Sequence, residues 1–267
     1  MSRKMIFVDT AICTGCKACS VACKAWNELP AENTQLITSY QSQDDFTVDT
    51  WTFVTFDEKY ENGKFNWMMR KSQCFHCGEP ACMKACSSEA ISKTDSGFVV
   101  IDQDKCIGCG YCMANCPWNI PRVVQSTFPK DAKAFKCTGC VNRVENGLAP
   151  SCVSTCQPGA LQFGDYDEMM ALAYQTLAIR KENHPRAQLY GDKIMGGTGY
   201  LYLLEDDPEV YGLPANPKTP VSLKLWKDIV YPLGGIAAGA AVAAVAVGVI
   251  SNAARGNYRN KPDHSEH

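Results

Sequence analysis

The sequence predicts an α+β protein in which two small modules are organised by cysteines and are followed by a membrane-spanning helix. Three observations carry this prediction. The 267-residue chain contains 16 cysteines, which fall into four groups of four. The segment that leads into the first group is repeated before the third group. Residues 229–254 contain no charged side chain.

The four groups have related spacings. The first and third read Cys-x2-Cys-x2-Cys-x3-Cys, the second reads Cys-x2-Cys-x4-Cys-x3-Cys, and the fourth reads Cys-x2-Cys-x11-Cys-x3-Cys. In chain order the groups are Cys13, Cys16, Cys19 and Cys23; Cys74, Cys77, Cys82 and Cys86; Cys106, Cys109, Cys112 and Cys116; Cys137, Cys140, Cys152 and Cys156.

Disulfides, zinc and iron-sulfur clusters are the candidates for what these cysteines form. Disulfides between such close neighbours would be strained, and a chain of this length can bury a core without so many cross-links. Zinc would use four-sulfur sites, which pairs of Cys-x2-Cys units can supply. The Cys-x2-Cys-x2-Cys-x3-Cys run, however, is the bacterial ferredoxin pattern, in which the fourth cysteine ligates the other cluster. The spacing therefore favours iron-sulfur clusters.

The residue before the second cysteine supports this interpretation. It is glycine in three groups, at Gly15, Gly108 and Gly139. Glycine permits a positive φ and lets backbone amides turn toward the cluster sulfurs. The second group has His76 at this position. Because four cysteines are already present there, we interpret His76 as a loop residue or a hydrogen-bond donor beside the cluster rather than as a ligand.

The internal repeat predicts the local fold. Residues 8–16 align with residues 101–109, and both segments are typical of a strand, a turn and a cluster loop. Residues 95–97, Asp-Ser-Gly, lie between two short apolar runs and indicate a hairpin. Two such halves make one ferredoxin-like module with two clusters, so four groups predict two modules.

These motifs resemble the four-cluster electron-transfer subunits of the molybdopterin oxidoreductase family over most of residues 4–165. The resemblance implies four [4Fe-4S] clusters, with groups one and four in one module and groups two and three in the other. It also implies four ligand sets, which we label a to d. They are set a, Cys13, Cys16, Cys19 and Cys156; set b, Cys137, Cys140, Cys152 and Cys23; set c, Cys74, Cys77, Cys82 and Cys116; and set d, Cys106, Cys109, Cys112 and Cys86.

Two segments outside the cysteine groups have their own patterns. Aromatic-rich runs at residues 50–56 and 64–69 flank an Asn-Gly pair at 62–63, which predicts a hairpin with its aromatic side chains on one face. This hairpin could dock a catalytic subunit or cover the cluster loops, and the sequence leaves both open. Residues 166–183 have the apolar spacing of a helix that packs on the core.

The C-terminal third predicts a membrane anchor. We divide the chain into the cluster region 1–165, a helix and connector at 166–228, one transmembrane helix at 229–252 and a polar tail at 253–267. The Ala-, Val-, Ile- and Gly-rich run is long enough to span a bilayer, and Gly235 and Gly239 would let another membrane helix pack closely. The alternative is a buried helix in a soluble assembly.

Residues 189–191, 196–204, 211–214 and 221–227 extend the resemblance to nearly the whole chain. They are similar to the iron-sulfur beta subunits of membrane-bound, respiratory formate dehydrogenases. The resemblance implies a non-catalytic subunit of an oxidoreductase complex. A catalytic subunit with a molybdenum or tungsten bis-pterin would oxidise formate to carbon dioxide, and this chain would relay the electrons toward a membrane cytochrome b and quinone.

The resemblance also implies a location at the cytoplasmic membrane, with the cluster region on its outer, periplasmic face. The N-terminal residues show no export signal, so we expect export together with a partner. No nucleophile-base constellation is present, and a formal charge of −2 without a basic stripe argues against nucleic acid. The alternatives are the equivalent anchored subunit of a hydrogenase or sulfur-compound reductase, and a zinc scaffold without redox activity.

Overall fold

The computed structural model describes residues 2–37, 40–61, 63–124, 131–230 and 246–247, and it divides into two units, Met1–Thr219 and Pro220–His267. The strands of the first unit are β1 (Lys4–Asp9), β2 (Phe53–Glu61), β3 (Lys64–Ser72), β4 (Ile91–Lys93), β5 (Val99–Ile101), β6 (Arg122–Val123), β7 (Ala134–Phe135), β8 (Leu161–Asp165), β9 (Gln188–Tyr190) and β10 (Tyr200–Leu204). Its helices are η1 (Thr10–Ile12), α1 (Ala18–Trp26), α2 (Ala81–Ala85), α3 (Tyr111–Ala114), α4 (Val141–Glu145), α5 (Ser151–Ser154), α6 (Tyr166–Lys181) and η2 (Pro208–Tyr211). The described part of the second unit contains α7 (Val221–Leu225) and η3 (Trp226–Val230).

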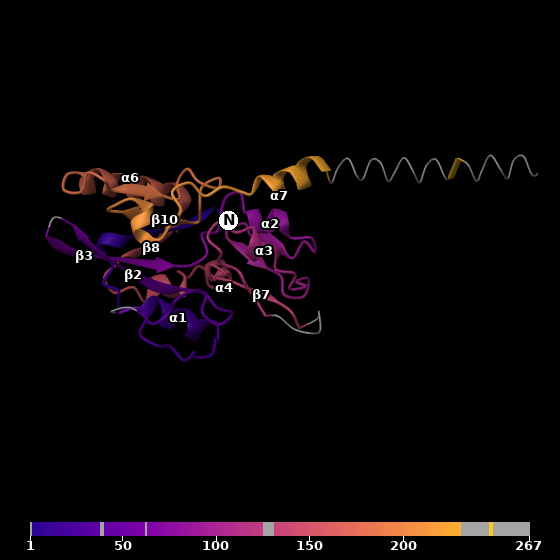
Figure 1. Ribbon diagram of the computed structural model, residues 1–267, viewed down its shortest axis with the longest axis horizontal. Helices are drawn as coiled ribbons and strands as arrows, with labels where there is room; N and C mark the ends of the chain where they lie inside the picture. Colours follow the sequence, from indigo (N-terminus) through magenta and orange to yellow (C-terminus); the bar gives the residue numbers. More distant parts are fainter. Residues whose placement is uncertain (1, 38–39, 62, 125–130, 231–245, 248–267) are drawn as a thin grey trace, which may run out of the picture. The chain divides into compact units, whose positions relative to one another are not determined.

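A four-stranded sheet in the order β8-β1-β10-β9 forms the centre of the first unit. Strand β1 pairs antiparallel with β8 and parallel with β10. Because side chains alternate along a strand, the sheet has two different faces. One face contacts α6, which lies along the sheet in Figure 1 and buries Ala173 against it. The sheet residues on that face are Met5, Phe7, Leu201 and Leu203.

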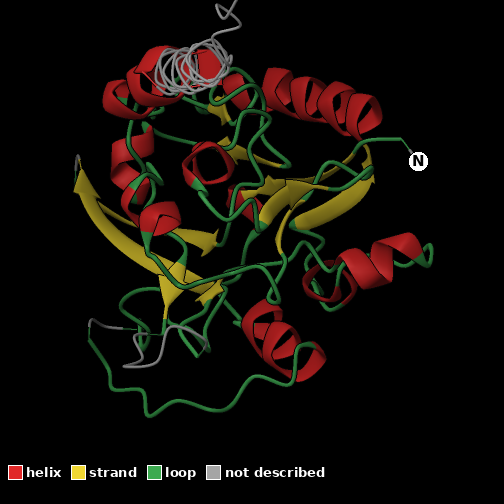
Figure 2. Cartoon of the chain, turned by 90° about the vertical axis from the view of Figure 1, so that its right-hand side faces the viewer, coloured by secondary structure: helices red, strands yellow, loops and turns green. Residues whose placement is uncertain are grey.

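The opposite face of the sheet packs against the cysteine loops. Its side chains share one hydrophobic core with thiols from two different groups, those of Cys74, Cys137 and Cys152. The sheet residues on this face are Ile6, Val8, Tyr200, Tyr202 and Leu204. Figure 2 shows short helices and loops around the strands. The sheet therefore separates α6 from the region that positions the thiols.

Three predicted elements are confirmed. Strands β4 and β5 form the hairpin expected around residues 95–97. Strands β2 and β3 form the longer hairpin, with Phe56 paired to Met69 and Tyr60 paired to Phe65. Helix α6 is the helix expected at 166–183. The aromatic face is confirmed for Phe56, which shares its face with Phe65 and Trp67, whereas Phe53 points to the other face.

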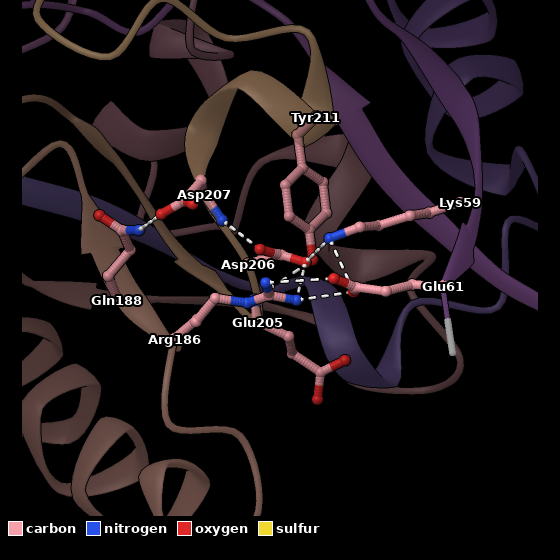
Figure 3. A network of polar contacts seen from close by, with 8 residues as sticks. All are labelled: Lys59, Glu61, Arg186, Gln188, Glu205, Asp206, Asp207 and Tyr211. Carbon is pink, nitrogen blue, oxygen red and sulfur yellow. Dashed lines mark hydrogen bonds and ion pairs between the residues drawn. The ribbon is translucent and has the colours of Figure 1, made fainter. Parts of the chain in front are cut away.

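An ion-pair network ties the far end of this hairpin to the loop after β10 (Figure 3). The carboxylate of Asp206, which is 3% exposed, lies 2.6 Å from the ammonium of Lys59 and 3.0 Å from the guanidinium of Arg186. Arg186 also pairs with the half-exposed carboxylate of Glu61 at 2.9 Å. The network therefore fixes β2 relative to the segments that flank β9 and β10.

Residues 166–228, which the sequence analysis treated as a helix and connector, also supply strands β9 and β10 to the central sheet. All five residues of β10 are buried, because this strand lies between β1 and β9 and is covered on both faces. A continuous apolar run such as Tyr-Leu-Tyr-Leu-Leu is typical of a strand in this position. The C-terminal third of the chain thus completes the fold that begins at β1.

No helix in the described part of the chain has the length and hydropathy needed to cross a bilayer. The predicted span at 229–252 falls mostly outside the described residues, as do Gly235, Gly239 and the polar tail.

Candidate iron-sulfur cluster sites

The loops that carry the first two cysteines of each group share a left-handed backbone turn. The predicted positive φ is confirmed at Gly15 and Gly108, both at +63°, and at Gly139, at +69°. Gly108 is also tightly packed, because a Cβ built on it would lie 2.5 Å from the Cβ of Ala132 and closer still to its carbonyl group. Glycine is therefore required at Gly108 both by its backbone angle and by the neighbouring chain.

His76 adopts the same left-handed conformation, with φ of +47°, and is fully buried. Its Nδ1 accepts a hydrogen bond of 2.9 Å from the amide of Val99, and its ring packs edge-on against Phe98. Burial, and then the ammonium groups of Lys136 and Lys71, hold the pKa of His76 well below its usual range. The side chain is therefore a neutral loop imidazole whose Nδ1 is occupied.

Short helices bring cysteines from different groups together. The third cysteine of each group lies in α1, α2, α3 or α5, and the fourth follows about one helical turn later. Helix α1 packs against α5, and α2 packs against α3. Helices α1 and α5 belong to groups one and four, and α2 and α3 belong to groups two and three. Each helix contact therefore places the fourth cysteine of one group next to the other group.

Two cavities are lined by the cysteines of sets c and d. The first is lined by Cys74, Cys77, Cys82 and Cys116, together with Phe75 and Trp118. The second is lined by Cys86, Cys106, Cys109 and Cys112, together with Ile91 and Ile101. Each cavity has three cysteines from one group and the fourth cysteine of the other group. The structure thus brings together the members of sets c and d.

The members of sets a and b also lie close together. Burial, reinforced by the neighbouring thiols of Cys137, Cys152 and Cys140, raises the pKa of Cys23. These four cysteines are the members of set b. In set a, the pKa of Cys13 is raised by burial and by the thiols of Cys156 and Cys16, against a hydrogen bond from the Gly15 amide. Cys19 of set a is in turn close to Cys13.

Most of the cysteine side chains are buried or half-buried, as a cluster requires. Burial is the main cause that raises the pKa of Cys19, Cys112, Cys116 and Cys140 to about 11, and that of Cys82 to about 12. Such thiols stay protonated at neutral pH until a metal replaces the proton. Within the described ranges, no three His, Cys, Asp or Glu side chains converge on the position of a single ion. Four thiols around an apolar cavity fit the ligand set of a [4Fe-4S] cluster.

The glycine run before β10 has a role that the sequence did not predict. The amide of Gly78 donates a 2.6 Å hydrogen bond to the carbonyl of Gly197, and a Cβ on Gly78 would overlap the carbonyl of Gly196. The amide of Gly199 donates to the carbonyl of Phe75 at 2.9 Å. This run therefore packs on the Cys74–Cys77 loop. The signal in the sequence that could have indicated this close approach is the four glycines at positions 78, 196, 197 and 199.

Two lysines that the sequence did not single out, Lys71 and Lys136, are buried, at 2% and 4% exposed. Burial alone would lower the pKa of Lys71, but the negative charge that Cys152, Cys19 and Cys137 carry once deprotonated outweighs it and holds that pKa above its usual range.

Comparisons with known proteins agree with this geometry. Two families described as 4Fe-4S dicluster domains match residues 65–166 and residues 12–90. The chain is 43% identical over 238 residues to the formate dehydrogenase iron-sulfur subunit of Haemophilus influenzae, covering 87% of this chain and 75% of the relative. It is 42% identical over 231 residues to the iron-sulfur subunit of the nitrate-inducible formate dehydrogenase of Escherichia coli, covering 85% and 77%. A formate dehydrogenase 2 beta subunit (cytochrome c-553) of Nitratidesulfovibrio vulgaris is 34% identical over 217 residues, covering 78% and 96%.

Proposed function

Because this chain belongs to the family of formate dehydrogenase iron-sulfur subunits, we propose that it relays electrons between a formate-oxidising catalytic subunit and an acceptor in the membrane. The chain is a non-catalytic electron-transfer component and carries four [4Fe-4S] clusters in two dicluster domains. Such clusters supply reversible one-electron transfer. The role of the protein is to hold them at fixed positions, exclude water and adjust their potentials.

The sixteen cysteines hold these clusters in sets a to d. Two cavities lined by the members of sets c and d support this assignment. The grouping of Cys23 with Cys137, Cys140 and Cys152 supports set b, and the effect of the Cys156 thiol on the pKa of Cys13 supports set a. In every set the fourth ligand comes from the other group of the module, as in two-cluster ferredoxins.

The observation that best supports a relay is the linear order of the four sets. Cys19 of set a is close to Cys152 of set b. Cys137 of set b and Cys74 of set c belong to one hydrophobic core, and Cys82 of set c packs against Cys106 and Cys112 of set d in another. These neighbours support the order a, b, c, d.

The two ends of this series are open to solvent. Cys16 in set a and Cys109 in set d are exposed, whereas the cysteines of sets b and c are buried or half-buried. A chain of buried clusters with an exposed cluster at each end can accept electrons at one surface and release them at another.

The partners follow from the family and from the sequence. The catalytic subunit would hold the molybdenum or tungsten bis-pterin and oxidise formate. The charge-free segment 229–254 supports a membrane anchor and favours a membrane cytochrome b and quinone as the acceptors. The cluster region would lie on the periplasmic face of the cytoplasmic membrane and be exported with its partner.

Exposed aromatic side chains near set a support a protein partner at that end. On β3, Trp67 and Phe65 are 40% and 53% exposed, and Tyr40 packs edge-on against Trp67. The same face of the hairpin covers Gly15 with Phe56. The hairpin therefore covers a cluster loop with one end and leaves an aromatic surface at the other.

A tag on this chain provides the test. The complex is purified from source membranes, and reduction of an artificial dye is measured with formate, with hydrogen and with sulfur compounds as separate substrates. We expect dye reduction with formate. A cluster-bearing complex that ignores formate but responds to another donor would assign the chain to a hydrogenase or a sulfur-compound reductase instead. A variant that ends at residue 228 tests the anchor, since its complex should leave the membrane fraction.

A further inference from the structure

Two lysines are buried among the thiols, where a positive charge has no access to water. Lys71 on β3 is 2% exposed and Lys136, next to Cys137, is 4% exposed. Burying an ammonium group is costly unless negative charge and hydrogen-bond acceptors surround it. Their positions therefore require a compensating charge nearby, and the thiolates and clusters of this protein provide it.

Lys71 lies at the junction of sets a and b. Its ammonium donates a hydrogen bond of 3.0 Å to the side-chain oxygen of Gln73 and lies 5.0 Å from the centre of the Tyr200 ring. The Tyr200 hydroxyl is in turn 3.9 Å from the sulfur of Cys152 in set b. The same ammonium is close enough to Cys19 of set a to lower the pKa of that thiol against its burial.

Lys136 lies at the junction of sets b and c. Its ammonium donates hydrogen bonds to the carbonyls of Val99 and Cys137, the latter at 3.0 Å, and Cys137 is a member of set b. Lys136 also lines the cavity that contains the thiols of set c. Within this cavity it acts on Cys74, where it opposes the effect of burial on the thiol pKa.

The two ammonium groups are not neutralised by a protein carboxylate within the described residues, where no ion pair involves either lysine. The buried ring of His76 is near enough to both lysines for their charges to lower its pKa. The positive charges at the two junctions are thus free to act on the clusters on either side of them.

We propose that Lys71 and Lys136 are fixed positive charges that raise the reduction potentials of the clusters on either side of them, and of the cluster in set b most of all. The inference rests on the proposed electron-transfer function and on the ligand sets. An added electron makes a cluster more negative, so a nearby ammonium stabilises the reduced form. Set b adjoins both lysines, sets a and c adjoin one each, and set d adjoins neither.

This arrangement predicts a specific pattern of shifts. Lys71→Met should lower the midpoint potentials of two of the four clusters, those in sets a and b. Lys136→Met should lower two, those in sets b and c, so that one cluster responds to both substitutions. We expect at least about a tenfold weakening of reduction at each affected cluster, which corresponds to a downward shift of about 59 mV for one electron.

The test is a potentiometric titration of the purified complex followed by low-temperature electron paramagnetic resonance. Lys71→Arg and Lys136→Arg keep the charge and should leave all four potentials close to those of the native complex. Lys181→Gln removes an exposed lysine from α6, on the far side of the sheet, and is the matched control for loss of one positive charge. Iron content of about 16 atoms per chain shows that a variant has retained its clusters.

The outcomes separate the inference from the proposed function. Four unchanged potentials in cluster-bearing Met variants would overturn the inference, as would equal shifts in the Arg and Met variants. If a Met variant loses its clusters, the Lys71→Gln and Lys136→Gln variants, which keep a hydrogen-bond donor, should show the same downward shifts in midpoint potential. A native complex without four reducible clusters would instead overturn the proposed function, and with it the premise for the lysines.

Discussion

Gly108 provides a sharp test of how the backbone shapes a cluster loop. It lies between Cys106 and Cys109 of set d, at φ of +63°, against the backbone of Ala132. Gly110, two residues later, is also left-handed, at +79°, but a Cβ built there meets nothing within 4 Å. Substitution of each glycine by alanine therefore separates the cost of the backbone angle from the cost of the contact.

The expected magnitudes follow from these two features. An alanine in the left-handed region costs about 1–2 kcal/mol, and both variants bear this cost. In Gly108→Ala the new methyl group would also overlap the carbonyl of Ala132. Overpacking of this kind typically adds about 1–3 kcal/mol, and a backbone neighbour cannot rotate away as a side chain can. Gly108→Ala should therefore be destabilised by about 2–5 kcal/mol and Gly110→Ala by about 1–2 kcal/mol.

Iron analysis and thermal unfolding of the purified complex measure the difference. We expect Gly108→Ala to lose the cluster of set d, with about 12 iron atoms per chain in place of about 16, and to unfold at a lower temperature. Gly110→Ala should keep its iron. Equal iron contents and equal unfolding temperatures in the two variants would refute the reasoning.

Three further predictions concern the ligand sets, the ion-pair network and the clusters as a structural element. Cys23→Ser should alter one cluster signal, and that signal should also change in Cys152→Ser; a change shared with Cys13→Ser instead would contradict the exchange of fourth ligands. Asp206→Asn should destabilise the chain by about 1–3 kcal/mol, because charged hydrogen bonds to a buried carboxylate are lost. Glu61→Gln, which removes a half-exposed carboxylate of the same network, should change the unfolding temperature less; the reverse order would argue against the role given to Asp206. Removal of iron by a chelator should lower the unfolding temperature and increase protease cleavage, because the buried thiols then lose the groups that join them; an iron-free chain that melts like the native one would contradict this.

Local signals in the sequence predicted much of this structure. The Asn-Gly pair and the flanking aromatics identified the β2–β3 hairpin, and the apolar period identified α6. Glycines before the second cysteines predicted the left-handed turns. The cysteine spacing, together with the family resemblance, predicted which thiols lie together. The hairpin, the helix and the turns depend on a few adjacent residues, so a single sequence displays them, whereas the ligand sets came from the resemblance.

Features that depend on distant segments were harder to predict. The parallel pairing of β1 with β10 joins residues near the two ends of the first unit, and no local pattern specifies it. The packing of Gly196, Gly197 and Gly199 on the Cys74–Cys77 loop could not be predicted, because that loop is more than 100 residues away in sequence. Lys71 was missed because a lysine in a strand is normally taken to face solvent. Phe53 points away from the other aromatics because strand alternation places it with Thr55.

The central claim is that electrons from formate pass through the clusters of this chain. The most direct measurement is to mix the intact anaerobic complex with formate, freeze it within turnover, and record the reduced-cluster signals by low-temperature electron paramagnetic resonance. We expect formate to produce reduced-cluster signals in the complex. Substitution of the cysteines in sets a to d should remove those signals, which assigns them to this chain. The account would be contradicted if formate still drove dye reduction while dithionite alone, and not formate, reduced the clusters of this chain.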